Sequence, residues 1–442
     1  MMDLFSTKQW FGEFFLQDVY DKRFTGQIEY SPENGVMLSY TITGNAVPAE
    51  SEVVFGVLTS GEKCTLVGKF SPQNTDRTFK NGLTTRSGKA GFMYLVIGDF
   101  LTHDEMLFDF GFSLTNLQEF FFYKGKKDLV RYSEKPIFCM STSFGEMKIG
   151  HNASFGSLHK DIKSQIYCRD PDALNELESA FKEIGVKYPN SSFMLKKDIA
   201  YRIHFHFNSG ATIRNAYDHI SDIANLFALL IYSPMYPDSI HVQKKRGDDH
   251  PITLEIFPSR FLNTRTIELA TQEKLNFRMP ITNASVALDK IAQAWLQAPQ
   301  NHSTIISGIQ NETGFRDEHS VHGEIVLYAT QLESISHNDG KKSKYDKYEY
   351  PLKHYGCKKI RDGLSTIFGK ANLTDIGKAI GDMRDDIAHV NRPRTLLKTL
   401  SLKDMVHISQ YMELTIVGYI MTTIGVPADA ITKYQEEFCP GE

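Results

Sequence analysis

The sequence predicts an α+β protein of several domains, with a β-rich N-terminal region, a mixed α/β middle and an all-helical C-terminal bundle. Short alternating runs of apolar and polar residues, separated by glycine, asparagine and proline, fill residues 1–150. Strand-like and helix-like patterns are mixed over 151–282, and apolar residues recur at steps of three and four over 283–442. A chain of 442 residues has room for two or three domains.

The N-terminal region is typical of strands joined by turns. The runs that predict strands are GQIEYS, GVMLSYTITG, SEVVFGVLTS, CTLVGKFS and GFMYLVIGDF. We find no combination of residues in this region that points to catalysis. One alternative stays open, in which this β-rich part is itself active, as a ligand-binding or metal-dependent hydrolase domain.

The middle region continues the N-terminal domain with strands and helices together. DPDALNELESAFKEIG predicts a helix, because acidic residues fill its first turn and a glycine stands near its end. YRIHFHF predicts a strand on which His204 and His206 share one face with Arg202. Two such histidines suit zinc, but no third ligand lies nearby in sequence, so we favour an ordinary polar sheet face and expect no metal or other cofactor. Lys244, Lys245 and Arg246 are expected in a loop between strands.

The C-terminal region carries four amphipathic stripes, which predict a helical bundle. The stripes are Ile325, Tyr328, Leu332 and Ile335; Leu352, Ile360, Leu364 and Ile367; Leu373, Ile376, Ile380, Met383, Ile387 and Val390; and Met405, Ile408, Met412, Ile416 and Tyr419. A polar connector, residues 337–351, joins the first two stripes.

The stretch RDDIAH on the third stripe carries the chemistry that we consider most informative. His389 can move a proton near neutral pH, and Arg384 can hold a phosphate by two hydrogen bonds. In an unbroken helix His389 lies about 140° round from Arg384, so the two converge only if the helix ends or bends near His389 or if two chains pair. Pro393 makes an end within a few residues reasonable, and a helix C-terminus favours a protonated imidazole.

The same spacing occurs in RNAYDH, from Arg214 to His219, which we interpret as the ordinary start of a helix. For Arg384 and His389 the alternative to catalysis is a surface ion pair with Asp385 or Asp386 beside a solvated histidine. The spacing alone does not decide between these interpretations, so the context has to.

That context resembles a known family. The C-terminal 150 or so residues are similar to a HEPN domain of the ApeA-like type, a helical bundle with an Arg-x4-6-His motif that Arg384 and His389 match. TQLESIS resembles an earlier helix of that family, and YMELTIVGYIMTTIGVP resembles its last helix. GEFFLQDVYDKRFTGQIEYSPENGVMLSY resembles the β-rich domain that precedes HEPN in ApeA-type phage-defence proteins. The family often has asparagine after the arginine, where this chain has Asp385.

The resemblance implies a metal-independent endoribonuclease that cleaves RNA by attack of its 2′-hydroxyl, with Arg384 and His389 catalytic and Asp385 auxiliary. It also implies a homodimer, a role in abortive infection, and an N-terminal sensor that responds to a phage-derived trigger. Transfer RNA is the substrate that we favour. The alternative is a non-catalytic HEPN module that binds RNA or protein.

Basic residues near the motif are candidates for RNA binding. Lys341, Lys342 and Lys344 lie in the polar connector with Lys347, and Arg392 and Arg394 lie just beyond the motif. The competing interpretation of the lysines is a solvated loop. Because the net charge is −4, any contact with RNA depends on such local patches.

The remaining properties favour a cytoplasmic protein. The five cysteines are scattered, which is typical of reduced thiols without a zinc site. The N-terminus, MMDLFSTKQW, lacks the apolar core of a signal peptide. The longest uncharged apolar run, 414–428, is about 15 residues, too short to span a membrane.

Overall fold

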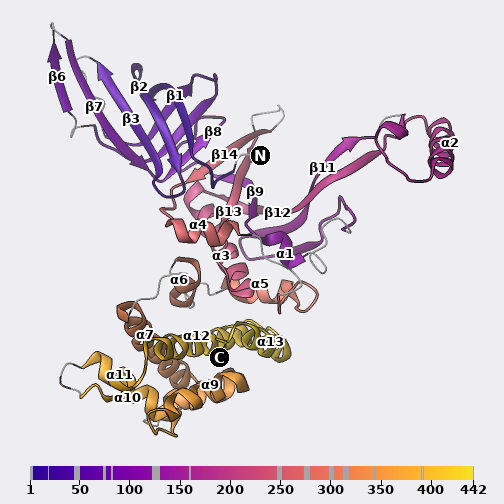
Figure 1. Ribbon diagram of the computed structural model, residues 1–442. Coiled ribbons are helices and arrows are strands. Elements are labelled where there is room, and N and C mark those ends of the chain that lie inside the picture. The colour runs from indigo at the N-terminus through magenta and orange to yellow at the C-terminus, as the bar shows by residue number, and fades with distance from the viewer. Residues whose placement is uncertain are drawn as a thin grey trace.

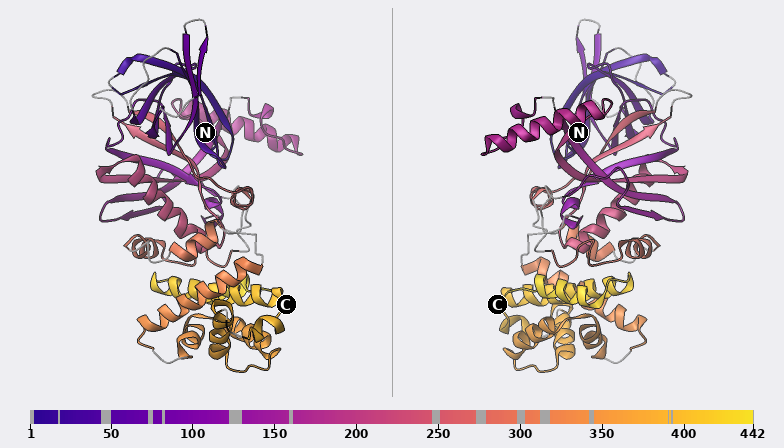
Figure 2. Two further views of the ribbon diagram at one scale, coloured as in Figure 1. Left: turned by 90° about the vertical axis from the view of Figure 1, so that its left-hand side faces the viewer. Right: turned by 90° about the vertical axis from the view of Figure 1, so that its right-hand side faces the viewer.

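The structure is a computed structural model. It describes residues 3–17, 19–43, 50–72, 76–80, 83–121, 130–158, 161–245, 251–272, 279–297, 303–311, 318–341, 345–389, 391 and 393–441. Within these residues a large sheet lies above a helical bundle, as Figures 1 and 2 show, and the C-terminus belongs to the bundle.

One antiparallel sheet collects the strands of the N-terminal and middle regions. Its order is β10-β11-β12-β9-β13-β14-β8-β5-β4-β1-β2-β3-β7-β6. The strands are β1 Lys8–Leu16, β2 Val19–Ser31, β3 Gly35–Thr43, β4 Ser51–Leu58, β5 Lys63–Phe70, β6 Asp76–Lys80, β7 Leu83–Phe92, β8 Tyr94–Ile97, β9 Leu107–Leu114, β10 Phe138–Ser141, β11 Gly145–Ser157, β12 Met194–Ala211, β13 Pro237–Lys244 and β14 Ile252–Pro258.

The half of the sheet that contains β1 to β7 curls around its own core. Phe70 on β5 stacks on Phe24 of β2 with ring centroids 5.6 Å apart, and also lies 6.3 Å from Phe92 of β7. β5 and β7 are far apart in the strand order, so their rings meet only because the sheet bends round. The twist of a sheet with many strands favours such curling.

The other half of the sheet, which contains β9, β12 and β13, is covered on one face by α3 (Ile213–Ile231). Alternate residues of β12, among them Ile203, Phe205 and Phe207, are buried on the α3 side, while His204 and His206 are exposed on the other. The predicted strand YRIHFHF and the division of its two faces are therefore confirmed. β12 pairs with β9, which comes from the N-terminal region, so strands from both sides of residue 150 share this sheet.

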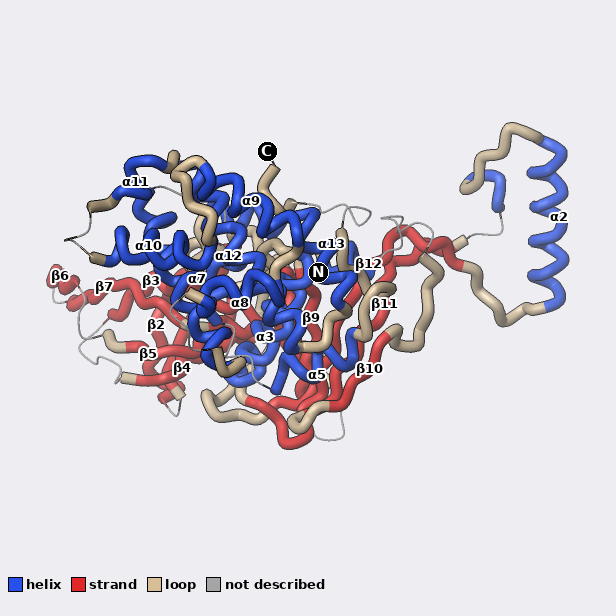
Figure 3. Tube along the Cα trace, turned by 90° about the horizontal axis from the view of Figure 1, so that it is seen from below, coloured by secondary structure: helices blue, strands red, loops and turns tan. Residues whose placement is uncertain are grey.

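A long arm projects from the sheet. β11 and β12 run out as a ribbon, and α2 (Pro171–Lys187) lies at its far end, away from the body of the molecule (Figures 1 and 3). The helix was predicted from its sequence, and Asp170 caps it by accepting from Asp172 N and Ala173 N. None of the residues of α2 is buried.

The helices that follow β14 connect the sheet to the bundle and then form it. The remaining helices are α1 Leu117–Phe121, α4 Thr264–Thr271, α5 Leu288–Gln297, α6 Ser303–Asn311, α7 Glu318–Asn338, α8 Asp346–Tyr355, α9 Lys358–Gly369, α10 Ile376–Ala388, α11 Thr395–Thr399, α12 Leu402–Thr423 and α13 Ala428–Phe438. None of the described helices is long and apolar enough to cross a bilayer.

The α+β fold class is confirmed, but the prediction of four bundle helices was wrong in detail. The stripe from Leu352 to Ile367 belongs to two helices, α8 and α9, which are separated at Gly356 and Cys357. The physical reason is Gln435 of α13, which is buried in the bundle. Its amide donates to Tyr355 O at 2.6 Å and accepts from Cys357 N at 2.8 Å, so it satisfies the backbone groups that the break exposes. The sequence alone did not indicate this contact.

The pH dependence of stability tests the packing of α3. Burial, with a further contribution from the Asp218 carboxylate, raises the pKa of Asp222 from 3.8 to about 6. The protonated form therefore stabilises the folded state below about pH 4, and this contribution is lost as the pH rises through 6. We expect Asp222→Asn to remove this loss and to be about 1–2 kcal/mol more stable than the wild type at pH 7.5.

Urea unfolding at pH 4.5, 6 and 7.5 measures the effect. Asp21→Asn, which removes an exposed carboxylate from β2, is the control and should keep the wild-type pH dependence. If the free energy of unfolding changed with pH equally in the wild type and in Asp222→Asn, the raised pKa of Asp222 would be contradicted.

Candidate active site at the end of α10

Helix α10 is held in place by a capped start and a tightly packed face. Asp375 caps it by accepting from Lys378 N at 2.8 Å. Ala379, Ile380 and Met383 are buried in the bundle. Gly377 lies so close to the segment before α8 that a Cβ atom there would be 2.6 Å from Tyr345 O. The orientation of α10, and of its far end, is therefore fixed by packing.

The helix ends where convergence of Arg384 and His389 requires it to end. His389 is the C-cap residue, with extended φ of −117° and ψ of 119°, and its N–H donates to Asp385 O at 3.0 Å. Asp386 is only 6% exposed, and its Oδ2 accepts from Leu396 N at 3.2 Å. This contact ties the start of α11 to the last turn of α10, so the chain turns away directly after the motif.

Three side chains converge at this end. Arg384 Nη1 lies 3.4 Å from Asp385 Oδ1, and His389 Nε2 lies 3.9 Å from the same oxygen. The side chains of Arg384 and Asp385 are each 30% exposed, whereas that of His389 is 62% exposed. The Nε atom of Arg384 is buried and has no hydrogen-bond partner among the described residues.

This geometry combines both interpretations of the motif. The ion pair of Arg384 with Asp385 is present, as expected if the motif were only a surface ion pair. The imidazole of His389, however, is turned toward the same carboxylate oxygen. An oxygen atom thus lies between a guanidinium and an imidazole, which is the position that a phosphate oxygen would take if the carboxylate moved aside. The arrangement is able to hold an anion and to transfer a proton beside it.

Two of the basic candidates, Lys341 and Arg394, lie within the described residues. Arg394 is exposed in a left-handed conformation with φ of 53°, immediately before α11 and close to the motif in sequence. The connector instead reaches α10 at Gly377, which is about 18 Å along the helix axis from His389. Lys341 at its start lies over the Tyr350 ring at 5.5 Å. Lys342, Lys344 and Arg392 lie outside the described residues.

The connector is also shorter than predicted. Residues 346–351 belong to α8, and Lys347 there pairs with Glu333 at 2.7 Å, which makes it a bundle contact.

The second Arg-x4-His spacing, Arg214 to His219, has a structural role. RNAYDH forms the start of α3, as expected, with Thr212 as the N-cap residue. His219 stacks on Phe144 at 4.1 Å between ring centroids, and burial lowers the pKa of this histidine. Arg214 is exposed.

The two histidines of β12 have an acidic neighbour that the sequence did not reveal. His206 Nδ1 lies 2.7 Å from Asp109 Oδ1 of β9, a residue nearly a hundred positions earlier. Even so, the part of the chain that the structure describes contains no group of three or more His, Cys, Asp or Glu residues able to hold a metal ion.

The fold and the site define a class of protein, in which a sheet-rich domain is followed by a HEPN-type bundle whose Arg-x4-His motif lies at a helix end. Residues 9–295 match the family model for ApeA N-terminal domain 1, and residues 326–430 match that for Apea-like HEPN. The chain therefore belongs to the ApeA family, and the family resemblance seen in the sequence is confirmed. No curated protein and no solved structure shows significant similarity to it.

The sequence indicated Asp386 only as a possible ion-pair partner, and it did not show that this residue links the end of α10 to the start of α11. We expect Asp386→Ala to lower the free energy of unfolding by about 1–3 kcal/mol, because a buried backbone N–H loses its acceptor. Urea unfolding measures this loss. Asp385→Ala is the matched control, because its carboxylate is partly exposed and should change stability by less than about 1 kcal/mol. Equal effects of the two substitutions would contradict this division of roles.

Proposed function

We propose that this protein is a metal-independent HEPN endoribonuclease that acts in abortive anti-phage defence. The observation that carries the proposal is the convergence of Arg384 and His389 on one oxygen at the end of α10. The match of residues 326–430 to Apea-like HEPN supports it, because the HEPN family consists in general of ribonucleases. The proposed cleavage needs no metal ion to supply a nucleophile, because the 2′-hydroxyl of RNA is itself the nucleophile.

In the proposed mechanism Arg384 binds the scissile phosphate and stabilises the charge that develops in the transition state. His389 accepts the proton of the 2′-hydroxyl, whose oxygen forms a bond to phosphorus, or donates a proton to the 5′-oxygen as the P–O5′ bond breaks. The products are a 2′,3′-cyclic phosphate and a 5′-hydroxyl. Asp385 is the auxiliary residue, because its carboxylate lies between the two proposed catalytic side chains, where a phosphate oxygen would bind.

A single motif offers one histidine, whereas the reaction needs an acid and a base on opposite sides of the scissile bond. A homodimer that places two α10 ends face to face supplies both, through a self-complementary surface. Arg394 is exposed just beyond the motif and extends the basic surface toward RNA.

The sheet-rich domain is proposed as the sensor that restrains the nuclease until a phage component is present. Transfer RNA is the favoured substrate, and the proposed compartment is the cytoplasm. Sequencing of RNA ends from cells that express the wild type or His389→Ala identifies the RNA that is cut.

The central test is substitution of the two motif residues. Arg384→Ala and His389→Ala should each lower RNA cleavage by about a hundredfold or more, since each removes a group that acts in the transition state. The assay measures cleavage of a labelled transfer RNA in buffer with EDTA. Neither side chain belongs to the hydrophobic core, so both variants should keep the wild-type free energy of unfolding within about 1 kcal/mol.

Arg214→Ala and His337→Ala are the matched controls. Both remove an exposed side chain of the same type from another helix and should leave activity unchanged. Undiminished cleavage by either folded motif variant would refute the assignment. RNA binding by a wild-type protein that does not cleave would favour the alternative, a non-catalytic module.

Asp385→Asn tests whether the carboxylate competes with RNA. The ion pair at 3.4 Å between partly exposed groups is worth at most about 1 kcal/mol, so its removal should lower KM for RNA about two- to fivefold. Steady-state kinetics separate KM from kcat. Asp382→Asn removes the same charge from α10 and should change KM less. A strong fall in kcat for Asp385→Asn would instead make Asp385 a positioning residue for Arg384 and His389.

Dilution tests the requirement for two chains. Cleavage per chain should fall as the protein is diluted below the dissociation constant of the dimer, which sedimentation measures independently. Full activity per chain in a protein that sediments as a monomer would refute the dimer.

A further inference from the structure

The face of the sheet that α3 does not cover carries a row of polar side chains across four neighbouring strands. His204 on β12 lies opposite Gly111 on β9, Gly111 lies opposite His241 on β13, and His241 lies opposite Glu255 on β14. Residues that lie opposite each other in a sheet point to the same face. The side chains of His204, His241 and Glu255 therefore form one row, with Gly111 between the two histidines.

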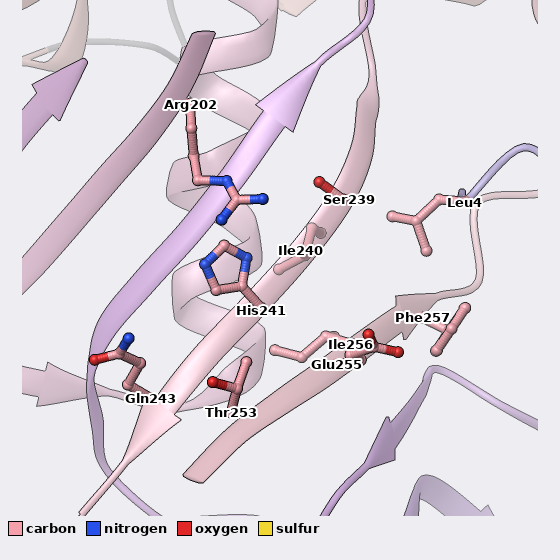
Figure 4. A pocket seen from close by; sticks show the side chains of 10 residues that line it. All are labelled: Leu4, Arg202, Ser239, Ile240, His241, Gln243, Thr253, Glu255, Ile256 and Phe257. Carbon is pink, nitrogen blue, oxygen red and sulfur yellow. The ribbon is translucent and has the colours of Figure 1, made fainter. Parts of the chain in front are cut away.

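Gly111 makes the space in the middle of this row. A Cβ atom at that position would lie 2.2 Å from His241 Nε2, so the imidazole occupies the place of a side chain on β9. The rings of His204 and His241 meet edge-on across the glycine, with centroids 6.3 Å apart and planes at 81°. In Figure 4 the guanidinium of Arg202 lies beside the His241 imidazole.

Two adjoining hollows lie over this row. The first, of about 260 Å³, is lined by Arg202, His241 and Glu255, with Ser239, Gln243 and Thr253 around them (Figure 4). The second, of about 170 Å³, shares His241 and Gln243 with the first and extends to His204. Pockets for drug-sized ligands have about 300–1,000 Å³, so these hollows suit a small ligand.

The charges in the hollows are arranged with opposite signs at two ends. Asp109 Oδ1 lies 2.7 Å from His206 Nδ1, and Glu146 pairs with Lys148 at 2.6 Å, so both carboxylates already have partners of their own. Arg202 keeps its charge at neutral pH, because a guanidinium does not lose its proton there. Burial, and next the charge of Arg202, lower the pKa of His241 to about 4 and also lower that of His204, so both imidazoles are neutral hydrogen-bonding groups beside a cation.

Glu255 lies at the other, acidic end of the hollows. Burial, followed by the Glu62 carboxylate, raises the pKa of Glu255. Its Oε2 atom is buried and accepts no hydrogen bond from any of the described residues. A buried acceptor without a donor is costly to the fold, and a ligand that brings an N–H group would satisfy it.

We propose that this pocket binds a small molecule with a phosphate group, held by Arg202, His204 and His241, and an amino group, held by Glu255. A phosphate has three terminal oxygens, so one can accept from the guanidinium while the others accept from the two imidazoles; a carboxylate has too few. Adjacent strands are about 5 Å apart, so the amino group lies about one strand spacing from the phosphate. The proposal does not depend on RNA cleavage.

Calorimetric titration of the full chain at pH 7.5 tests the site with O-phosphoethanolamine, inorganic phosphate, ethanolamine and β-alanine. The wild type should bind phosphoethanolamine, bind inorganic phosphate more weakly, and bind the other two hardly at all. Arg202→Gln should weaken both phosphate compounds about tenfold or more. Glu255→Gln should abolish the preference for phosphoethanolamine over inorganic phosphate, because the amino group loses its carboxylate while the phosphate loses a repulsive charge.

Arg23→Gln, on β2 of the same sheet and outside both hollows, is the arginine control and should bind like the wild type. Thermal unfolding confirms that each variant is folded, and Glu255→Gln keeps the shape of the pocket if Arg202→Gln proves unstable. Failure of the wild type to bind either phosphate compound, equal binding of β-alanine, or unchanged binding by folded Arg202→Gln would each overturn the proposal.

Discussion

Burial of helix α3 on both sides is the constraint on which the rest of the structure depends. On the sheet side Tyr217 of α3 packs edge-on against Tyr94 of β8 at 5.8 Å between ring centroids. On the bundle side the Tyr434 hydroxyl of α13 donates to Leu229 O at 2.6 Å, which satisfies one of the carbonyls that the end of a helix leaves free. Trp295 Nε1 of α5 donates to Asp222 O at 2.8 Å on the same helix. Sheet and bundle therefore share one continuous core, and a change on the sheet has a packed route to the bundle.

The candidate nuclease site depends on two consecutive carboxylates, Asp385 and Asp386, which have different contacts. Successive residues of a helix differ in direction by about 100°, so Asp385 and Asp386 point to different surroundings. Asp386 is buried and holds the start of α11, which ends the helix. Asp385 is partly exposed and meets Arg384 and His389. Asp386 therefore shapes the end of α10, whereas Asp385 lies between Arg384 and His389, where the proposed function places a phosphate of RNA.

The regular elements could be predicted where the sequence carries a local pattern. The alternation of YRIHFHF predicted β12 and its buried face, the acidic first turn of DPDALNELESAFKEIG predicted α2, and the apolar stripe around Ile380 and Met383 predicted α10. The division of the bundle into α8 and α9 could not be predicted, because its cause is the amide of Gln435, nearly eighty residues further along the chain. Local patterns report the neighbours within a few residues, whereas a broken helix is stabilised by whichever distant group reaches it.

By itself the sequence determined the α+β class, the family, and the identity of Arg384, Asp385 and His389 as the residues to consider. It also determined that a helix through the motif would separate Arg384 from His389 unless it ended there. Only the tertiary structure decided that it does end, because Asp386 reaches Leu396 across the turn. Likewise only strand register brings His204, His241 and Glu255 into one row, since pairing between strands joins residues whose separation along the chain no local pattern records.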